Sequence, residues 1–474
     1  MARDNSFWRT KSFEALSEAA GKNILVPTLS WPHLIALGIG AIIGTGIYTL
    51  IGEAAGLAGP AVLLSFAIAG GVSACAALAY AELATLIPSS GSAYTYSYVG
   101  LGEPAAWVVG WSLILEYTVV CAAVAVGWSG HFTAFIAGLG FQPSPALTAG
   151  PLEGGIINLP AVLISFAVAG LLALGTKESA RLTIILVVVK ITALAIFIVI
   201  ALPHFDPSHF RPFLPDGFAA HSLPDGRSGG VMGAAAIIFF AFYGFDAVST
   251  AAEETKNPAR DLTIGIVGSM IACTAIYILV ASSAIGALPI SAFAHHDAPL
   301  VHILQALGQP LMATAIAAAA VIALPTVILA FMYGQSRVFF AMARDRLLPG
   351  ALASVNARTH TPIAMTLCVG CLVAALAGLL PLAMVAALAN AGTLCAFIAV
   401  CLCLMVLRWR EPQRPRTFAV PAPYLIGTGG LVGSIYLFTS LPPLTRKAFF
   451  AWNGAGLMIY LLVVRRRTLL ATER

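Results

Sequence analysis

The sequence predicts an all-α integral membrane protein with twelve transmembrane helices. Of its 474 residues, 59% are hydrophobic and only 9% are charged, whereas a soluble domain typically carries about 25% charged residues. The apolar residues form long blocks, each close to the ~20 residues that a helix needs to cross the hydrocarbon core of a bilayer. We expect spanning segments at 33–55, 61–84, 105–134, 156–176, 182–203, 229–252, 263–288, 311–343, 361–380, 384–407, 423–441 and 448–464.

The basic residues predict the orientation of these segments. With the N-terminus inside, 20 of the 25 Lys and Arg residues fall on the cytoplasmic side, as the positive-inside rule requires. An even number of crossings puts both termini there. We therefore expect a multi-pass protein of the cell (inner or plasma) membrane with cytoplasmic N- and C-termini. The other five basic residues are Arg211, Arg227, Arg446 and Lys447 outside, and Lys190 within a span.

Two spans depart from a smooth apolar helix. The first has four glycines within residues 38–46, and the sixth has glycine and aspartate within residues 239–246. Unwound backbone inside a membrane is tolerated only where it lines a cavity, and paired interruptions are typical of a transporter binding site. Because the two spans are five apart, they also fit a five-helix inverted repeat.

The chemistry of the two interruptions favours a zwitterionic ligand. An unwound segment over Gly44–Gly46 would present backbone N–H groups and a positive half-helix end to a carboxylate. A break after Phe240 would offer free carbonyl groups to an ammonium. Together they predict a carrier of a zwitterion. The alternative is that the glycines only allow close helix packing.

Several motifs carry a resemblance to a known family. Gly-Ala-Ile-Ile-Gly-Thr-Gly-Ile at 40–47, Tyr-Ala-Glu at 80–82 and Pro-Ser-Ser-Gly-Ser-Ala-Tyr at 88–94 resemble the amino acid–polyamine–organocation (APC) superfamily. The segments 239–260 and 334–345 are similar to its cationic amino acid transporter (CAT) subfamily, in its bacterial form.

The resemblance implies the LeuT-type fold, in which helices 1–5 and 6–10 are inverted repeats with broken helices 1 and 6, and helices 11 and 12 are peripheral. The chain then divides into a cytoplasmic N-terminal segment (1–30), the first repeat (31–203), an external loop (204–228), the second repeat (229–407), and helices 11 and 12 with the cytoplasmic C-terminus (408–474).

The same resemblance implies a secondary active permease that moves L-amino acids by alternating access, through proton-coupled symport. An exchanger or a sodium-coupled carrier remains an alternative. The partners would be an amino acid, H⁺ and the lipid bilayer, with no nucleic acid and no cofactor or metal. A small single-span accessory subunit is not readable from the sequence. A membrane-embedded enzyme is disfavoured, because the sequence has no H-E-x-x-H or G-x-S-x-G motif. A channel is disfavoured, because paired broken helices fit alternating access better than a pore.

Site residues follow from the matched motifs. The substrate carboxylate would meet Ile42, Ile43, Thr45 and Gly46, and the ammonium would meet the carbonyl groups of Phe240, Ala241 and Tyr243. Whether the substrate side chain is cationic or neutral stays open.

Lys190 is a candidate for the coupling group. It lies nine residues beyond Arg181, which at 1.5 Å per residue puts it roughly 13 Å deep in the membrane. An intramembrane lysine is a functional candidate by default. In the LeuT-type fold it would point at the junction of helices 1 and 8, where its ammonium would replace sodium and carry the proton. A permanently charged structural strut is the alternative.

Other polar residues in the spans have two interpretations each. Glu116 is assigned to the proton path, or to a hydrogen bond between helices. Asp246 would cap the second half of helix 6, a structural role, or would contact the substrate. Gly44 is also assigned a structural or gating role. Thr326 would supply a hydroxyl to the substrate site, or Pro325 before it only kinks the helix. Glu82 would take part in a cytoplasmic gate, or in a surface ion pair.

Overall fold

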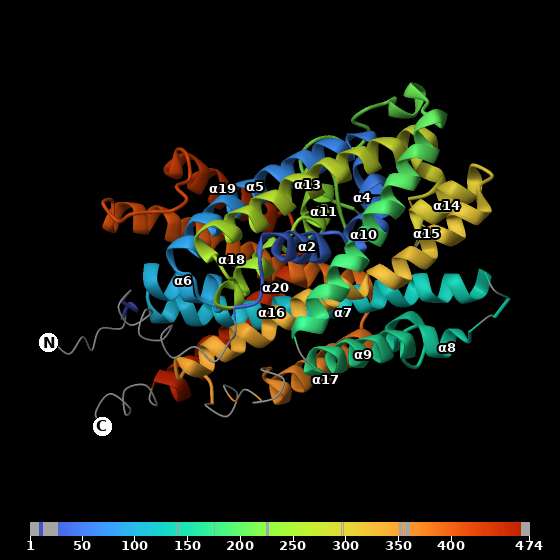
Figure 1. The fold of residues 1–474 in the computed structure, drawn as a ribbon. Helices are drawn as coiled ribbons and strands as arrows, with labels where there is room; N and C mark the ends of the chain where they lie inside the picture. Colours follow the sequence, from blue (N-terminus) through green and yellow to red (C-terminus); the bar gives the residue numbers. More distant parts are fainter. Residues whose placement is uncertain are drawn as a thin grey trace, which may run out of the picture.

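The computed structural model describes residues 9–12, 27–138, 140–141, 143–174, 176–223, 227–294, 296, 298–349, 354, 356 and 361–465. Most of the predicted N-terminal segment (residues 1–8 and 13–26) and the last residues, 466–474, lie outside this part of the chain. The described residues form an almost entirely helical protein (Figure 1).

The first half of the chain supplies the helices that correspond to the first five predicted spans. They are α2 (Trp31–Ile42), α3 (Thr45–Tyr48), α4 (Leu50–Ala58), η1 (Gly59–Ala61), α5 (Val62–Leu86), α6 (Ala93–Gly100), α7 (Glu103–Gly138), α8 (Pro145–Thr148), η2 (Pro151–Glu153), α9 (Leu159–Leu174) and α10 (Thr176–Ala201).

The predicted external loop has some structure of its own. It contains η3 (Leu202–His204), η4 (Pro207–Phe210) and the two short antiparallel strands β1 (His221–Ser222) and β2 (Ser228–Gly229). His221 pairs with Gly229, and Ser222 pairs with Ser228.

The second half supplies the helices of the other predicted spans. They are α11 (Gly230–Ile238), η5 (Phe239–Ala241), α12 (Phe245–Thr250), η6 (Ala252–Glu254), α13 (Pro258–Ala287), η7 (Ile290–Ala292), α14 (Pro299–Ala306), α15 (Pro310–Ala323), α16 (Pro325–Arg344), α17 (Ile363–Leu379), α18 (Leu382–Arg410), α19 (Pro423–Thr439), α20 (Pro443–Ile459) and the π-helical turn η9 (Tyr460–Val464).

Eight helical stretches of the described chain are long and apolar enough to cross a membrane, and three shorter helices are also apolar: Trp31–Ile42, Leu159–Leu174 and Ile363–Leu379. The protein is therefore a multi-pass membrane protein. Each predicted span coincides with a helix or an interrupted pair of helices. Twelve crossings and the inverted repeat stay predictions.

The helices lie side by side, with α8 and α14 at one end of the bundle and α6 at the other (Figure 1). In the core, α7 packs against α16 and α18, and α13 packs against α2 and α5. The short helices α6 and α14 were not predicted, because they are too short to produce an apolar block. This packing buries the interrupted helices at the centre of the bundle.

Candidate functional site

The first interruption separates α2 from α3. Helix α2 ends at Ile42, Ile43 is extended (φ −74°, ψ 103°), and α3 begins at Thr45. The predicted unwound segment, Gly44–Gly46, is therefore wrong by about one residue. Thr45 and Gly46 form the first turn of α3, and the backbone is non-helical at Ile43 and Gly44 instead.

The second interruption separates α11 from α12. After Ile238 the chain makes the 3₁₀ turn η5, and α12 starts at Phe245 with Gly244 as its N-cap. Gly244 has φ +118°, a backbone region that a residue with a Cβ atom rarely adopts. The break after Phe240 was thus predicted correctly, and it is completed by Gly244.

The two interruptions touch one another through their glycines. A Cβ atom on Gly46 would lie 2.5 Å from the Cα atom of Ala241, and one on Gly244 would lie 2.8 Å from the carbonyl carbon of Ala41. A Cβ atom on Gly44 would lie 2.8 Å from a methyl group of Val327 on α16. Only glycine permits this close approach, so the breaks and α16 form one connected site.

Lys190 of α10 extends into this site. Its side chain is 0% exposed, and its Nζ donates to the carbonyl oxygens of Gly40 (3.0 Å) and Ile43 (2.6 Å) and to Thr326 Oγ1 (2.7 Å). The carbonyl groups of Gly40 and Ile43 are available because α2 ends beside them. The ammonium is thus held by three neutral oxygens from the first interrupted helix and α16.

Thr326 is occupied by this lysine contact. Besides accepting from Lys190, its hydroxyl lies 3.1 Å from the Gly40 carbonyl and 2.7 Å from the Ala323 carbonyl. Pro325, the residue before Thr326, is the first residue of α16. The proline therefore marks the boundary between α15 and α16, and the threonine side chain binds Lys190.

Two tyrosines that the sequence did not single out complete the surroundings of the first interruption. Tyr277 Oη donates to the Ile42 carbonyl (2.6 Å), and Tyr48 Oη donates to the Lys190 carbonyl (3.2 Å). Both side chains are buried. Tyrosine in an apolar span resembles an ordinary packing residue, so the sequence offered no signal for either contact.

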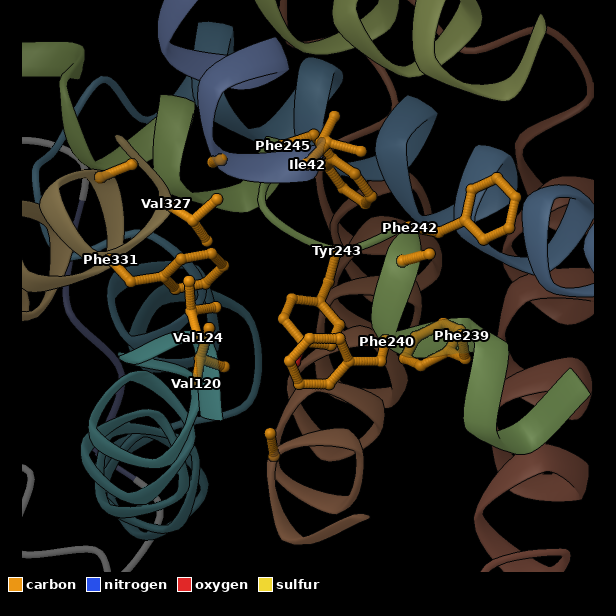
Figure 2. Packing of buried hydrophobic residues seen from close by; sticks show 14 of the residues in the cluster. Ile42, Val120, Val124, Phe239, Phe240, Phe242, Tyr243, Phe245, Val327 and Phe331 are labelled. Atoms are coloured by element: carbon orange, nitrogen blue, oxygen red, sulfur yellow. The ribbon is translucent and has the colours of Figure 1, made fainter. Parts of the chain in front are cut away.

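Apolar side chains gather around the two interruptions. Figure 2 shows Val120 and Val124 of α7 with Val327 and Phe331 of α16 on one side, and Tyr243 on the other. The Tyr243 and Phe331 rings pack edge to face, 5.7 Å apart. Figure 2 also shows Phe240 beside Tyr243, at a ring distance of 4.8 Å.

Two buried hydroxyls in this region have no hydrogen-bond partner among the described residues. They are Thr45 Oγ1 and Tyr243 Oη, each on one of the two interruptions. A buried hydroxyl without a partner is unfavourable, so both atoms are available to a polar group that enters the site.

The buried carboxyl groups of Asp246 and Glu116 have neutral partners. Asp246 accepts from Tyr117 Oη (2.6 Å) and from the Gly244 backbone N–H (3.0 Å). Asp246 therefore lies in the first turn of α12 and bonds back to the N-cap residue, rather than being the N-cap itself. Glu116 accepts from Thr393 Oγ1 (2.7 Å) through one oxygen, and its other oxygen has no partner in the described chain.

Ion pairs gather at the predicted cytoplasmic end. Glu254 accepts from Arg337 (3.0 Å), and Glu253 accepts from Arg344 (3.0 Å). Burial alone would raise the pKa of Glu253, but Arg344 and the backbone N–H of Ser90 hold the pKa of this carboxyl below its ordinary value. We call Glu253, Glu254, Arg337 and Arg344 the terminal ion-pair cluster.

Glu82 forms a separate group. Its side chain is 1% exposed and binds Arg408 (2.6 Å), Arg416 (2.9 Å) and the Val420 backbone N–H (2.7 Å). Glu82 thus holds the segment between α18 and α19 against α5. Glu82 thus pairs with one of the predicted basic cytoplasmic segments, and these pairs are buried rather than at the surface. Its part in a gate stays a prediction.

No group of three or more His, Cys, Asp or Glu side chains placed to hold a metal ion occurs in the described parts of the chain. The residues predicted to bind substrate lie together with Lys190 and Thr326 at the two interruptions. Glu82 is part of a different contact.

Comparisons with known proteins agree with this architecture. Residues 29–464 match the model of the amino acid permease family. The chain is 43% identical to the branched-chain amino acid permease BcaP of Bacillus subtilis (strain 168), with 98% of each chain covered. It is 38% identical to the methylthioribose transporter of the same organism, over 98% of this chain and 99% of that one.

A plant relative is also similar. The chain is 36% identical to the vacuolar cationic amino acid transporter 4 of Arabidopsis thaliana, over 86% of this chain and 68% of that one. The resemblance to the APC superfamily is thereby confirmed. The chain belongs to the amino acid permease family, and it is a membrane transporter rather than an enzyme.

Proposed function

We propose that this permease is a proton-coupled symporter of neutral L-amino acids that works by alternating access in a twelve-helix, LeuT-type arrangement. Its termini are cytoplasmic, and it acts in the cell membrane. The observation that carries the proposal is the set of contacts made by Lys190. A buried ammonium bound only by neutral oxygens has no carboxylate to hold its charge in place, so it can lose its proton when the surroundings change.

Substrate binding uses the two interruptions. The carboxylate meets the backbone at Ile43 and Gly46 and the unpartnered hydroxyl of Thr45. The ammonium meets the carbonyl groups of Phe240 and Ala241. Ile42 and Tyr243 complete the two sides, while Gly44 allows the close approach of α16. Thr326 acts through Lys190 rather than on the substrate.

Proton binding on Lys190 then links to transport through the first interruption. When Lys190 is charged, it pulls the Gly40 and Ile43 carbonyl groups toward α16. When it is neutral, this attraction weakens and the two halves of the first helix are free to move apart. Glu116, with one unpartnered oxygen, is a second proton-binding group on α7.

We place the substrate side chain among Val120, Val124, Val327 and Phe331, the apolar residues that Figure 2 shows facing Tyr243. These apolar side chains favour a medium-sized neutral substrate, because a cationic side chain would need a carboxylate beside it. The relative that is named a branched-chain amino acid permease agrees with this preference.

The test uses purified protein in proteoliposomes. All amino acids and methylthioribose are screened by thermal shift, and uptake of the best ligand is then measured with a pH gradient, with a sodium gradient, and with internal amino acid. We expect a branched-chain amino acid to bind best and the pH gradient alone to drive accumulation. Accumulation that needs sodium, or only exchange for internal amino acid, would contradict the proposal.

A further inference from the structure

His131 is a buried histidine of α7 that the mechanism above does not use. It is 1% exposed, and its Nε2 lies 3.3 Å from Thr49 Oγ1. Its other ring nitrogen, Nδ1, is buried without a partner among the described residues. It lies one helical turn beyond Gly127, at which a Cβ atom would lie 2.7 Å from Thr45.

The partner of His131 sits at a joint in the first interrupted helix. Thr49 has φ −123° and ψ −54°, and it separates the single turn α3 from α4. The preceding residue, Tyr48, meets the His131 ring edge to face at 6.3 Å. Tyr48 also donates to the backbone carbonyl of Lys190. His131 therefore contacts Thr49, at the joint between α3 and α4, and Tyr48, which binds the backbone of Lys190.

Among the described residues, His131 has no ion pair. The charged residue of α4 is Glu53, one turn beyond Thr49, and it lies 4.0 Å from Arg227.

Helices α3, α8, α9 and α15 all pack against α7. The titratable residue of α3 is Tyr48, and the other three helices contain no titratable residue. On α17 the titratable residues are Cys368 and Cys371, which are exposed.

The nearest polar contacts from the same part of α7 are also neutral. Ser129 donates to the Asn158 amide, and Trp128 donates to the Val321 carbonyl. On α16, Arg337 and Arg344 belong to the terminal ion-pair cluster at the far end of that helix.

This setting makes the charged imidazolium unfavourable while the joint is closed. A neutral ring binds Thr49 through Nε2 and leaves one nitrogen unpaired. A protonated ring would bury a positively charged N–H at Nδ1 with no acceptor, which is far more costly. Movement of α3 away from α7 would open the buried ring to water, so protonation favours that movement.

We propose that His131 is a positioning residue that links external pH to the opening of the outer half of the first interrupted helix. The inference rests on the proposed function and its topology. Neutral His131 holds Thr49 and keeps α3 packed against α7, which also fixes the start of α4. Protonated His131 releases it, so that the empty carrier faces outward where protons are plentiful.

The test measures hydrogen–deuterium exchange in the segment 45–58, in purified full-length protein in nanodiscs, corrected for the intrinsic pH dependence of amide exchange. Between about pH 7.5 and about pH 5.5, where histidine titrates, we expect exchange in wild type to rise about threefold or more. In His131→Gln, which keeps a hydrogen-bonding group but does not titrate, we expect the same exchange at both pH values. His209→Gln, in the predicted external loop, is the matched control and should behave like wild type.

Thr49→Val provides the second variant, because it removes the partner and keeps the histidine. It should exchange faster than wild type already at neutral pH, so its pH difference shrinks. A wild-type pH difference in either His131→Gln or Thr49→Val would overturn the inference, as would the absence of a difference in wild type.

Transport supplies the separate readout. In proteoliposomes, we expect the KM of wild type to fall at acidic external pH, because protonated His131 favours the outward-facing carrier. His131→Gln should lose this fall in KM, yet keep accumulation driven by a pH gradient. A wild-type KM profile in this variant would count against the role of His131. If wild type moves no amino acid at all, the proposed function fails, whereas the exchange measurement on His131 can still be interpreted.

Discussion

The Lys190 site and the terminal ion-pair cluster both bury positive charge, but they neutralise it differently. Arg337 and Arg344 each face a carboxylate, Glu254 and Glu253, at 3.0 Å. Lys190 faces two backbone carbonyl groups and a hydroxyl. An ion pair keeps its guanidinium charged, whereas neutral dipoles stabilise an ammonium without fixing its charge. The comparison separates guanidinium groups paired with carboxylates from an ammonium that only neutral oxygens contact among the described residues.

Among the substitutions that test this comparison, we expect a change of glycine at an interruption to reduce transport the most. Gly46→Ala should reduce transport by at least ~10-fold, because its Cβ atom would lie 2.5 Å from the Cα atom of Ala241 and protein interiors do not absorb such overlap. The measurement is initial uptake per mole of folded protein. The control is Gly71→Ala, whose Cβ atom would meet nothing within 4 Å and which should transport like wild type. Normal transport by Gly46→Ala would show that the two breaks do not need to touch.

Much of this central region is readable from the sequence. Glycines inside apolar spans indicated both interruptions, and the depth of Lys190 in its span singled it out. The hydrogen-bond and ion-pair partners of the buried polar groups could not be predicted from the sequence. Tyr277 contacts Ile42 across 235 positions of the chain, and Glu254 meets Arg337 across 83. Such contacts depend on how whole helices pack, and a single sequence carries no periodic signal for them.

Breaking an ion pair of the terminal ion-pair cluster should lower the stability of the fold more than it lowers proton-coupled transport. Glu254→Gln leaves Arg337 buried beside a neutral partner, which should lower the free energy of unfolding by about 3–5 kcal/mol. Thermal unfolding in detergent measures the loss. Glu411→Gln is the control, because its pair with Arg414 is partly exposed and is worth about 0–1 kcal/mol. Equal shifts in the two variants would contradict the assignment of Glu254 to a buried pair.

Thr326 tests whether the Lys190 site depends on all three of its oxygens. Thr326→Val removes the hydroxyl 2.7 Å from Lys190 Nζ, and a hydrogen bond to a charged group is worth about 1.5–3 kcal/mol. We expect accumulation driven by a pH gradient to fall about tenfold, while Thr326→Ser keeps most of it. The role of the hydroxyl would be refuted by a serine variant as impaired as the valine variant.

The smallest expected effect is the pH dependence of Glu253. Its pKa is lower in the folded protein, so its ion pair with Arg344 stabilises the fold above the ordinary carboxyl range. This stabilisation is lost as the pH falls through the lowered pKa. The difference in Tm between wild type and Glu253→Gln should therefore be constant between about pH 7 and pH 5 and narrow below about pH 4. A difference that grows at acidic pH would have the wrong sign.

The central claim is that Lys190 carries the coupling proton, and Lys190→Met tests it most directly. In proteoliposomes, this variant and the exposed-lysine control Lys256→Met are compared for uptake driven by a pH gradient and for exchange at equal pH. We predict that Lys190→Met loses all response to the pH gradient while Lys256→Met responds like wild type. Uptake by Lys190→Met that still follows the pH gradient would contradict the account.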